Sequence, residues 1–205
     1  MKVSKAQVAR NREKILEVAG RLYRERGIDG IGVADIMKEA GLTHGAFYGH
    51  FQSKDDLIIQ AFERAIDLGV KLWTKVAEGA GNNELAAVID FYLSPAHRDD
   101  PGLTCWFAAL GTDMGRQSAA IRAMTARGYE RVIDFLASVM PGSSVSTRRR
   151  QAYATYSSLI GGVAMARTIQ DPALANEITE AVMAEIHKNL GLAPRPKKLK
   201  PKKHR

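Results

Sequence analysis

The apolar residues of this chain recur at helical spacing along nearly its whole length, and this pattern restricts the fold more than any other feature. Ile15, Ala19 and Leu22, for example, stand at positions i, i+4 and i+7 of one helical face. Gly27 follows them where a helix would stop. No segment alternates with a period of two between turn signals, so strands are not expected. The sequence therefore predicts an all-α protein of about nine helices.

Residues that cap and stop helices set the limits of these elements. Ser4 with Gln7 and Ser53 with Asp56 have the spacing of residues that begin a helix. The expected helices cover about residues 5–26, 33–40, 44–50, 54–78, 84–94, 103–116, 119–140, 147–169 and 172–190. Residues 96–104 are polar and rich in turn formers, so we expect a loop there. We expect Ser146 or Thr147 to cap the helix that ends near residue 169.

Residues 31–54 predict two short helices that meet at an angle. Gly41 supplies the left-handed conformation that a tight turn between helices needs, and Thr43 is placed to cap the second helix. Phe47 and Phe51 lie four residues apart and would anchor that helix to a core. The opposite face and the exposed tip carry small and polar residues, namely His44, Gly45, Tyr48 and Gly49. A helix presented in this way fits the major groove of DNA.

A long run of residues in this segment matches a known pattern. The run consists of Ile36, Ala40-Gly41-Leu42-Thr43, Gly45-Ala46-Phe47-Tyr48, His50-Phe51 and Ser53-Lys54, preceded by Ile15-Leu16, Ala19, Gly27 and Gly30. Over about residues 10–65 the sequence thereby resembles the DNA-binding domain of TetR-family transcriptional regulators. The resemblance implies a three-helix DNA-binding domain at residues 5–53, with its helix-turn-helix at about 31–50. A larger helical domain for ligand binding and dimerisation would follow at residues 54–191.

The resemblance also implies which residues contact DNA. The eight candidates are Thr43, His44, Gly45, Ala46, Tyr48, Gly49, His50 and Lys54. Thr43, Tyr48 and Lys54 would bond phosphates, which position a protein on DNA without reading its sequence. His44, Gly45, Ala46 and Gly49 would face base edges, and His50 would lie near the backbone or a base. Gly49 departs from the family, which often has a larger side chain at this position.

Aromatic residues of the second domain are candidates for lining a ligand cavity. A buried tyrosine hydroxyl or indole N–H needs a polar partner, and pockets in helical proteins often lie between helices. The candidate ligand-binding residues are Cys105, Trp106, Phe91, Tyr92, Tyr129 and Tyr156. Ordinary core packing is the alternative for all of them. Cys105 is either a small buried apolar residue or a redox or electrophile sensor.

The net charge of +8 is unevenly distributed. Residues 1–54 hold 10 basic and 6 acidic side chains, residues 55–193 hold 13 and 16, and residues 194–205 hold 7 and none. The basic N-terminal part fits a polyanion partner, and with the helix-turn-helix pattern it points to double-stranded DNA. The tail at 192–205 is rich in proline and lysine, so we expect it to be disordered.

Several classes of protein are excluded by what the sequence lacks. A single cysteine permits neither an intrachain disulfide nor a cysteine-built zinc site and fits the reducing cytoplasm. No apolar run approaches a membrane span, and no signal peptide is visible. There is no glycine-rich phosphate loop, no nucleophile with a base partner and no metal cluster, so we expect neither an enzyme nor a cofactor.

These observations, together with the resemblance, predict a cytoplasmic, homodimeric transcriptional regulator. We expect a repressor that binds a palindromic operator in double-stranded DNA and is released by a small-molecule effector. Small residues in the last two helices would form the dimer interface by resemblance to the family, or would serve ordinary packing within one chain. Two alternatives remain open: a thiol-based sensor that acts through Cys105, and a structural DNA-binding protein without a ligand switch.

Overall fold

The computed structural model describes residues 4–100, 102 and 104–192, and within them the chain is helical without strands. It forms nine α-helices and, in this described part, two short 3-10 helices: α1 (Lys5–Arg26), α2 (Val33–Glu39), η1 (His44–Gly49), α3 (Lys54–Glu78), η2 (Gly81–Asn83), α4 (Glu84–Tyr92), α5 (Pro95–Asp99), α6 (Trp106–Gly115), α7 (Ala119–Val139), α8 (Val145–Arg167) and α9 (Pro172–Leu190). The all-α prediction is confirmed. The basic tail predicted at 192–205 lies, apart from Leu192, outside the described residues.

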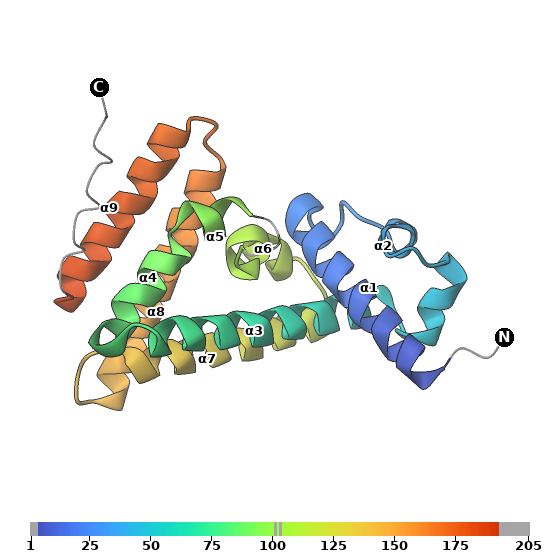
Figure 1. Ribbon diagram of the computed structural model, residues 1–205, viewed down its shortest axis with the longest axis horizontal. Helices are drawn as coiled ribbons and strands as arrows, with labels where there is room; N and C mark the ends of the chain where they lie inside the picture. The colour runs from blue at the N-terminus through green and yellow to red at the C-terminus, as the bar shows by residue number, and fades with distance from the viewer. Residues whose placement is uncertain (1–3, 101, 103, 193–205) are drawn as a thin grey trace, which may run out of the picture.

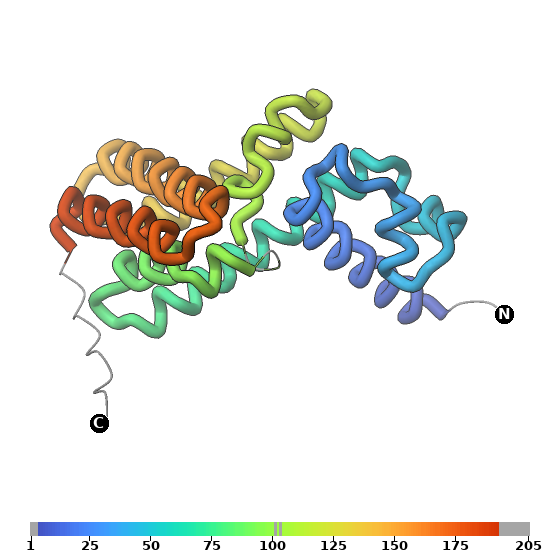
Figure 2. Tube along the Cα trace, turned by 90° about the horizontal axis from the view of Figure 1, so that it is seen from above, coloured from blue at the N-terminus to red at the C-terminus, as the bar shows by residue number. Residues whose placement is uncertain are grey.

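The long helix α3 connects the two parts of the molecule (Figure 1). At one end, α1, α2 and η1 gather around the beginning of α3, and α7 lies alongside its length. At the other end, α4, α8 and α9 form a helical bundle, and α6 stands between this bundle and α1. The view from above shows the same division (Figure 2).

Helix α1 begins and ends where its sequence signals predict. The hydroxyl of Ser4 accepts a hydrogen bond from the backbone N–H of Gln7 at 3.2 Å, which satisfies one donor of the first turn. Gly27 has φ +78°, and its N–H donates to the carbonyl of Tyr23 at 2.9 Å. The predicted apolar face is buried in the core, including Ile15, Leu16, Ala19 and Leu22.

Helix α3 is stabilised at its N-terminus and packed closely along its length. The Ser53 hydroxyl accepts a bond from the N–H of Asp56 at 3.1 Å, and acidic side chains in the first turn complement the helix dipole. Further along, Phe62 is fully buried against α7. A Cβ on Gly128 of α7 would lie 2.4 Å from a ring carbon of Phe62, so only glycine permits this approach. The two helices are therefore held at a fixed distance.

Helices α8 and α9 also approach closely, again at a glycine. A Cβ on Gly162 would lie 3.2 Å from a methyl group of Val182. The outer surface of this helix pair exposes two large apolar side chains, with Met165 58% and Leu174 44% exposed. The pair thus has one face packed within the chain and another with apolar groups in solvent.

The structure corrects three predictions of local structure. Part of the expected loop at residues 96–104 is the short helix α5, whose N-cap is Ser94 and whose first residue is Pro95. Helix α8 begins earlier than expected, because its cap is Ser144 and not Ser146 or Thr147. The second helix of the helix-turn-helix, η1, has 3-10 rather than α-helical hydrogen bonding.

Candidate functional site

The turn between α2 and η1 is built on Gly41. This residue has φ +71°, a left-handed conformation that L side chains rarely adopt. Its N–H donates to the carbonyl of Lys38, and the N–H of Leu42 donates to that of Met37, both at 2.9 Å. These bonds end α2 and turn the chain, so that η1 leaves at an angle.

Helix η1 is anchored on one side and open on the other. The rings of Phe47 and Phe51 are each 2% exposed and stack with centroids 5.7 Å apart. Tyr48, between them in sequence, is 71% exposed. Thr43, His44, Gly45 and Gly49 are also exposed, and Ala46 and His50 are half-buried. Seven of the eight candidate DNA-contacting residues thus lie in one short segment, with Lys54 just beyond it.

The exposed side chains and glycines of this segment form a surface that other molecules can approach. The ring of Tyr48 packs edge-on against His44 at 6.3 Å and against Phe47 at 5.3 Å, which limits its orientations. A Cβ on Gly45 or Gly49 would meet no atom within 4 Å. Internal packing therefore does not require glycine at either position, and both leave the backbone open to close approach.

Thr43 corrects one detail of the prediction. It occupies the N-cap position of η1 with extended backbone, but its side chain makes no capping hydrogen bond. The N–H of Ala46 instead donates to the Thr43 carbonyl at 3.0 Å, as expected for 3-10 bonding. The threonine hydroxyl is therefore not committed to a cap.

Lys54 connects the start of α3 to the loop after α1. Its half-buried ammonium donates to the backbone carbonyl of Ile28 at 2.8 Å. An ammonium group has three donors, so this bond does not prevent a further acceptor such as a phosphate. The phosphate contact of Lys54 stays a prediction, but the side chain also stabilises the domain itself.

Basic residues of α1 lie near the helix-turn-helix, although the sequence pattern did not single them out. A Cβ on Gly41 would lie 3.6 Å from the ammonium nitrogen of Lys14. The guanidinium of Arg12 lies 5.0 Å above the ring centroid of Phe51 and donates to Gln60. Arginine and lysine at these places add positive charge next to the helix-turn-helix.

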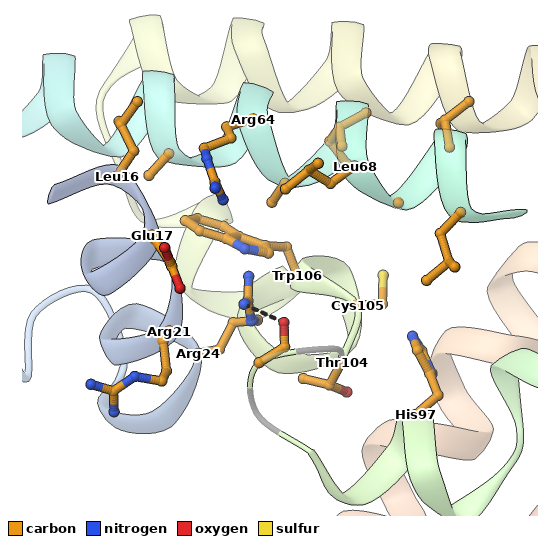
Figure 3. A pocket seen from close by; sticks show the side chains of 18 of the residues that line it. Leu16, Glu17, Arg21, Arg24, Arg64, Leu68, His97, Thr104, Cys105 and Trp106 are labelled. Atoms are coloured by element: carbon orange, nitrogen blue, oxygen red, sulfur yellow. Dashed lines mark hydrogen bonds between the residues drawn. The ribbon is translucent and has the colours of Figure 1, made fainter. Parts of the chain in front are cut away.

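A cavity of about 580 Å³ lies between α1, α3 and the segment that leads into α6 (Figure 3). Its volume is in the range of small-molecule sites. Three of the predicted ligand-binding residues line it: Cys105, Trp106 and Tyr156. Phe91, Tyr92 and Tyr129 are not among the lining residues.

The three remaining aromatic residues lie in the core behind the cavity. The ring centroids of Tyr92 and Tyr129 are 6.2 and 5.4 Å from that of Tyr156. Phe91 lies against His97, with centroids 5.4 Å apart. Burial is the main reason why the pKa of Tyr92 and Tyr156 is well above the usual value. Both phenols are therefore neutral at physiological pH.

Arginines at the α1 side of the cavity were missed by the sequence analysis. Arg24 donates to the backbone carbonyl of Gly102 at 2.8 Å, and its guanidinium lies 5.7 Å from the ring centroid of Trp106. Burial lowers the pKa of Arg24 to about 10, and the nearby charges of Arg64 and Arg167 also lower it. The group remains cationic at physiological pH. Sequence spacing gave no sign of these residues because they come from α1 and α3, far from the aromatic segment.

Two features are absent from the part of the chain that the structure describes. Among residues 4–100, 102 and 104–192 there is no group of three or more histidine, cysteine, aspartate or glutamate side chains that could hold a metal ion. In the same part of the chain, no helix combines the length and apolar character needed to cross a membrane.

Residues 15–61 match the family model described as bacterial regulatory proteins, tetR family, and this range includes the whole helix-turn-helix. Residues 15–61 are therefore similar to the DNA-binding segment of TetR-family regulators. Over 73 residues it is 32% identical to an HTH-type transcriptional regulator of Staphylococcus aureus strain USA300, a match that covers 36% of this chain and 40% of that protein. The chain thus aligns with less than half the length of the curated relatives it matches. These relatives are described as HTH-type transcriptional regulators, in agreement with the predicted helix-turn-helix.

Solved structures extend the likeness of fold to nearly the whole chain. The reduced form of E. coli NemR superposes with a TM-score of 0.74 at 20% identity, covering 92% of this chain and 99% of that one. A TetR transcriptional regulator from Legionella pneumophila gives a TM-score of 0.76 at 19% identity, with coverage of 93% and 100%. At such low identity these comparisons show a shared fold and do not identify a ligand.

Proposed function

We propose that the chain is a transcriptional regulator that recognises a palindromic operator in double-stranded DNA. The observation that carries the proposal is the exposed face of η1, with Tyr48, His44 and two glycines held outward by buried Phe47 and Phe51. This face lies within the family-matched segment. Its hydroxyl and imidazole groups can bond phosphates and base edges, and its glycines allow close approach to the groove.

A homodimer is part of the proposal. The outer surface of α8 and α9 exposes Met165 and Leu174 beside the small residues Ser157, Ser158 and Gly161. Small residues let helices from two copies approach closely. A two-fold pair would place two η1 helices in successive major grooves about 34–36 Å apart, which is why a palindromic site is expected.

We further propose that the protein is a cytoplasmic repressor released by a small-molecule effector. The cavity between α1 and α3 supports this, because its walls come from both the DNA-binding domain and the helical domain. An effector that binds better to a conformation with low DNA affinity would shift the population toward it. By linkage, operator DNA must then weaken effector binding by the same factor.

Selection of binding sites from a library of random DNA duplexes tests the proposed function. We expect enrichment of a palindrome, bound by a dimer whose mass is measured by light scattering. The affinity for this site should exceed that for scrambled DNA by at least about 1,000-fold. Binding without sequence preference would refute the proposal and support a structural DNA-binding protein.

A second candidate function is a repressor that senses oxidants or electrophiles through Cys105. The sulfur lines the cavity and lies 3.2 Å from the hydroxyl of Tyr156, and the structurally similar NemR is described in a reduced form. Because Cys105 is the single cysteine, thiol alkylation can occur nowhere else. N-ethylmaleimide should release operator DNA from the wild type but not from Cys105→Ser. Equal release from both proteins, or from neither, would exclude the thiol sensor.

A further inference from the structure

We propose that the cavity between α1, α3 and α6 is a binding site for an organic anion with an apolar body, and that its occupant bridges the DNA-binding and helical domains. This inference deepens the proposed function, on which it rests for the effect on DNA. The chemical class of the ligand is inferred from the residues that line the cavity.

One wall of the cavity is apolar and accessible. Leu68 and Leu72, one turn apart on α3, line it and are 49% and 36% exposed. Trp73 extends the same wall, and Figure 3 shows Leu68 on α3 beside the indole of Trp106. When a ligand covers apolar side chains that were open to solvent, the free energy of the complex falls. This wall therefore fits the hydrocarbon or aromatic part of a ligand.

Basic side chains also line the cavity. Arg21 and Arg24 come from α1 and Arg64 from α3, and they lie there with the carboxylate of Glu17. Arg21 also pairs with Glu25 and Glu39, and Arg64 pairs with Glu13. Figure 3 shows the guanidinium groups of Arg64 and Arg24 on either side of the Trp106 indole. Planar guanidinium groups bind carboxylate, sulfonate or phosphate oxygens through paired hydrogen bonds. The two guanidinium groups beside Trp106, those of Arg24 and Arg64, favour an anionic group over a cation at this place.

Two buried side chains add hydrogen-bonding groups to the lining. Trp106 and Thr104 are each 2% exposed and both line the cavity. Among the atoms of the described residues, the indole Nε1 of Trp106 and the hydroxyl of Thr104 have no hydrogen-bond partner. An indole N–H can only donate, so it complements an acceptor on the ligand. An anionic oxygen would satisfy it.

The position of the cavity gives its occupant a mechanical role. Its walls come from α1, from the middle of α3 and from the segment that leads into α6. An anion held by Arg24 on α1 and by Arg64 on α3, with its body against Leu68, would fix the distance between these helices. Because α1 packs against α2 and α3, this would set the position of the DNA-binding domain relative to the bundle.

A matched pair of dyes tests the site. The probes are 8-anilinonaphthalene-1-sulfonate and N-phenyl-1-naphthylamine, which share one apolar body and differ in the sulfonate. Both tryptophans of the chain, Trp73 and Trp106, line the cavity, so a dye bound there lies next to both donors of energy transfer. We expect saturable 1:1 binding of the sulfonate dye with quenching of tryptophan emission.

Arginine variants separate the charged part from the apolar part. Arg24→Gln should weaken binding of the sulfonate dye about tenfold and that of the neutral dye less than about twofold. Arg26→Gln is the matched control, because Arg26 is exposed on the same helix and does not line the cavity. Arg64→Gln provides the same test if circular dichroism shows that Arg24→Gln is unfolded.

The outcomes distinguish the site from the regulatory function. Equal losses for both dyes, unchanged binding in both arginine variants, or no energy transfer would each overturn the proposed anion site. Adding the sulfonate dye to the protein–operator complex tests the second step. Binding without a change in operator affinity would support the site but refute its bridging role in release from DNA.

Discussion

The hydroxyl of Tyr48 provides the sharpest test of the proposed DNA-binding face, through the substitution Tyr48→Phe. The side chain is 71% exposed, so loss of its hydroxyl should change the free energy of unfolding by less than about 0.5 kcal/mol. The ring contacts with His44 and Phe47 remain in the variant. Any effect on DNA binding can then be attributed to the missing oxygen.

The expected loss of affinity follows from one hydrogen bond in each subunit. A hydrogen bond to a charged phosphate contributes about 1.5 kcal/mol, so a dimer loses about 3 kcal/mol and its dissociation constant rises about 150-fold. The hydroxyl carries no charge, so the slope of log K against log salt should stay unchanged. Phosphate contacts carry no sequence information, and affinity for scrambled DNA should therefore fall by the same factor.

Fluorescence anisotropy titrations at four salt concentrations, with operator and scrambled duplexes, would measure these quantities. The matched control is Tyr153→Phe, because the Tyr153 hydroxyl donates to Glu130 within the bundle at 2.8 Å, far from η1. The control should bind DNA as the wild type does. Unchanged affinity in Tyr48→Phe, or a loss confined to the operator, would show that Tyr48 does not bond a phosphate.

Three further predictions follow from contacts in the structure. If the ammonium also contacts a phosphate, Lys54→Gln should lower the slope of log K against log salt by about one unit per subunit. The same change should lower the free energy of unfolding in urea by about 1 kcal/mol, because the bond to the Ile28 carbonyl is lost. Gly128→Ala should lower the midpoint of urea unfolding, because overpacking against Phe62 costs about 1–3 kcal/mol and exceeds the gain in helix propensity of about 1 kcal/mol. The control is Gly111→Ala, whose Cβ would meet nothing within 4 Å, and it should raise the midpoint. Burial lowers the pKa of His97. Below about pH 6.5 the unfolded chain therefore binds a proton that the folded chain does not, and the free energy of unfolding falls. In His97→Asn, this part of the loss in the free energy of unfolding between about pH 7.5 and 5.5 should be absent.

The DNA-binding domain could be predicted from the sequence because its determinants are local. Gly41 needs a left-handed turn, and the spacing of Phe47 and Phe51 assigns one face to the core whatever surrounds it. The helical type of η1 could not be derived in the same way. Six residues are too few for periodicity to separate 3-10 from α-helical bonding, and the absence of a Thr43 cap follows from that difference.

The cavity was beyond the reach of sequence reasoning because distant segments build it. Arg24, Arg64 and Trp106 meet only after α1, α3 and α6 have packed, and no spacing rule links these positions. The exposed pair Leu68 and Leu72 was a usable signal, since it widens the apolar face of α3.

The helix α5 was missed for another reason. Ser94 and Pro95 have the pattern of a helix start, but the polar, turn-forming residues after them are equally typical of a loop.

The sharing of α3 between the two parts of the molecule has a consequence for how such proteins can be recombined. The expected boundary at residues 53 and 54 falls at the beginning of α3, yet Leu57 and Ile58 are fully buried a few residues beyond it. Gln60 and Arg64 bond to residues of α1 across the same boundary. A chimera joined at residue 53 would therefore remove part of the DNA-binding domain's own core. A join that keeps the first three turns of α3 together with α1 would transfer the DNA-binding domain with its core intact.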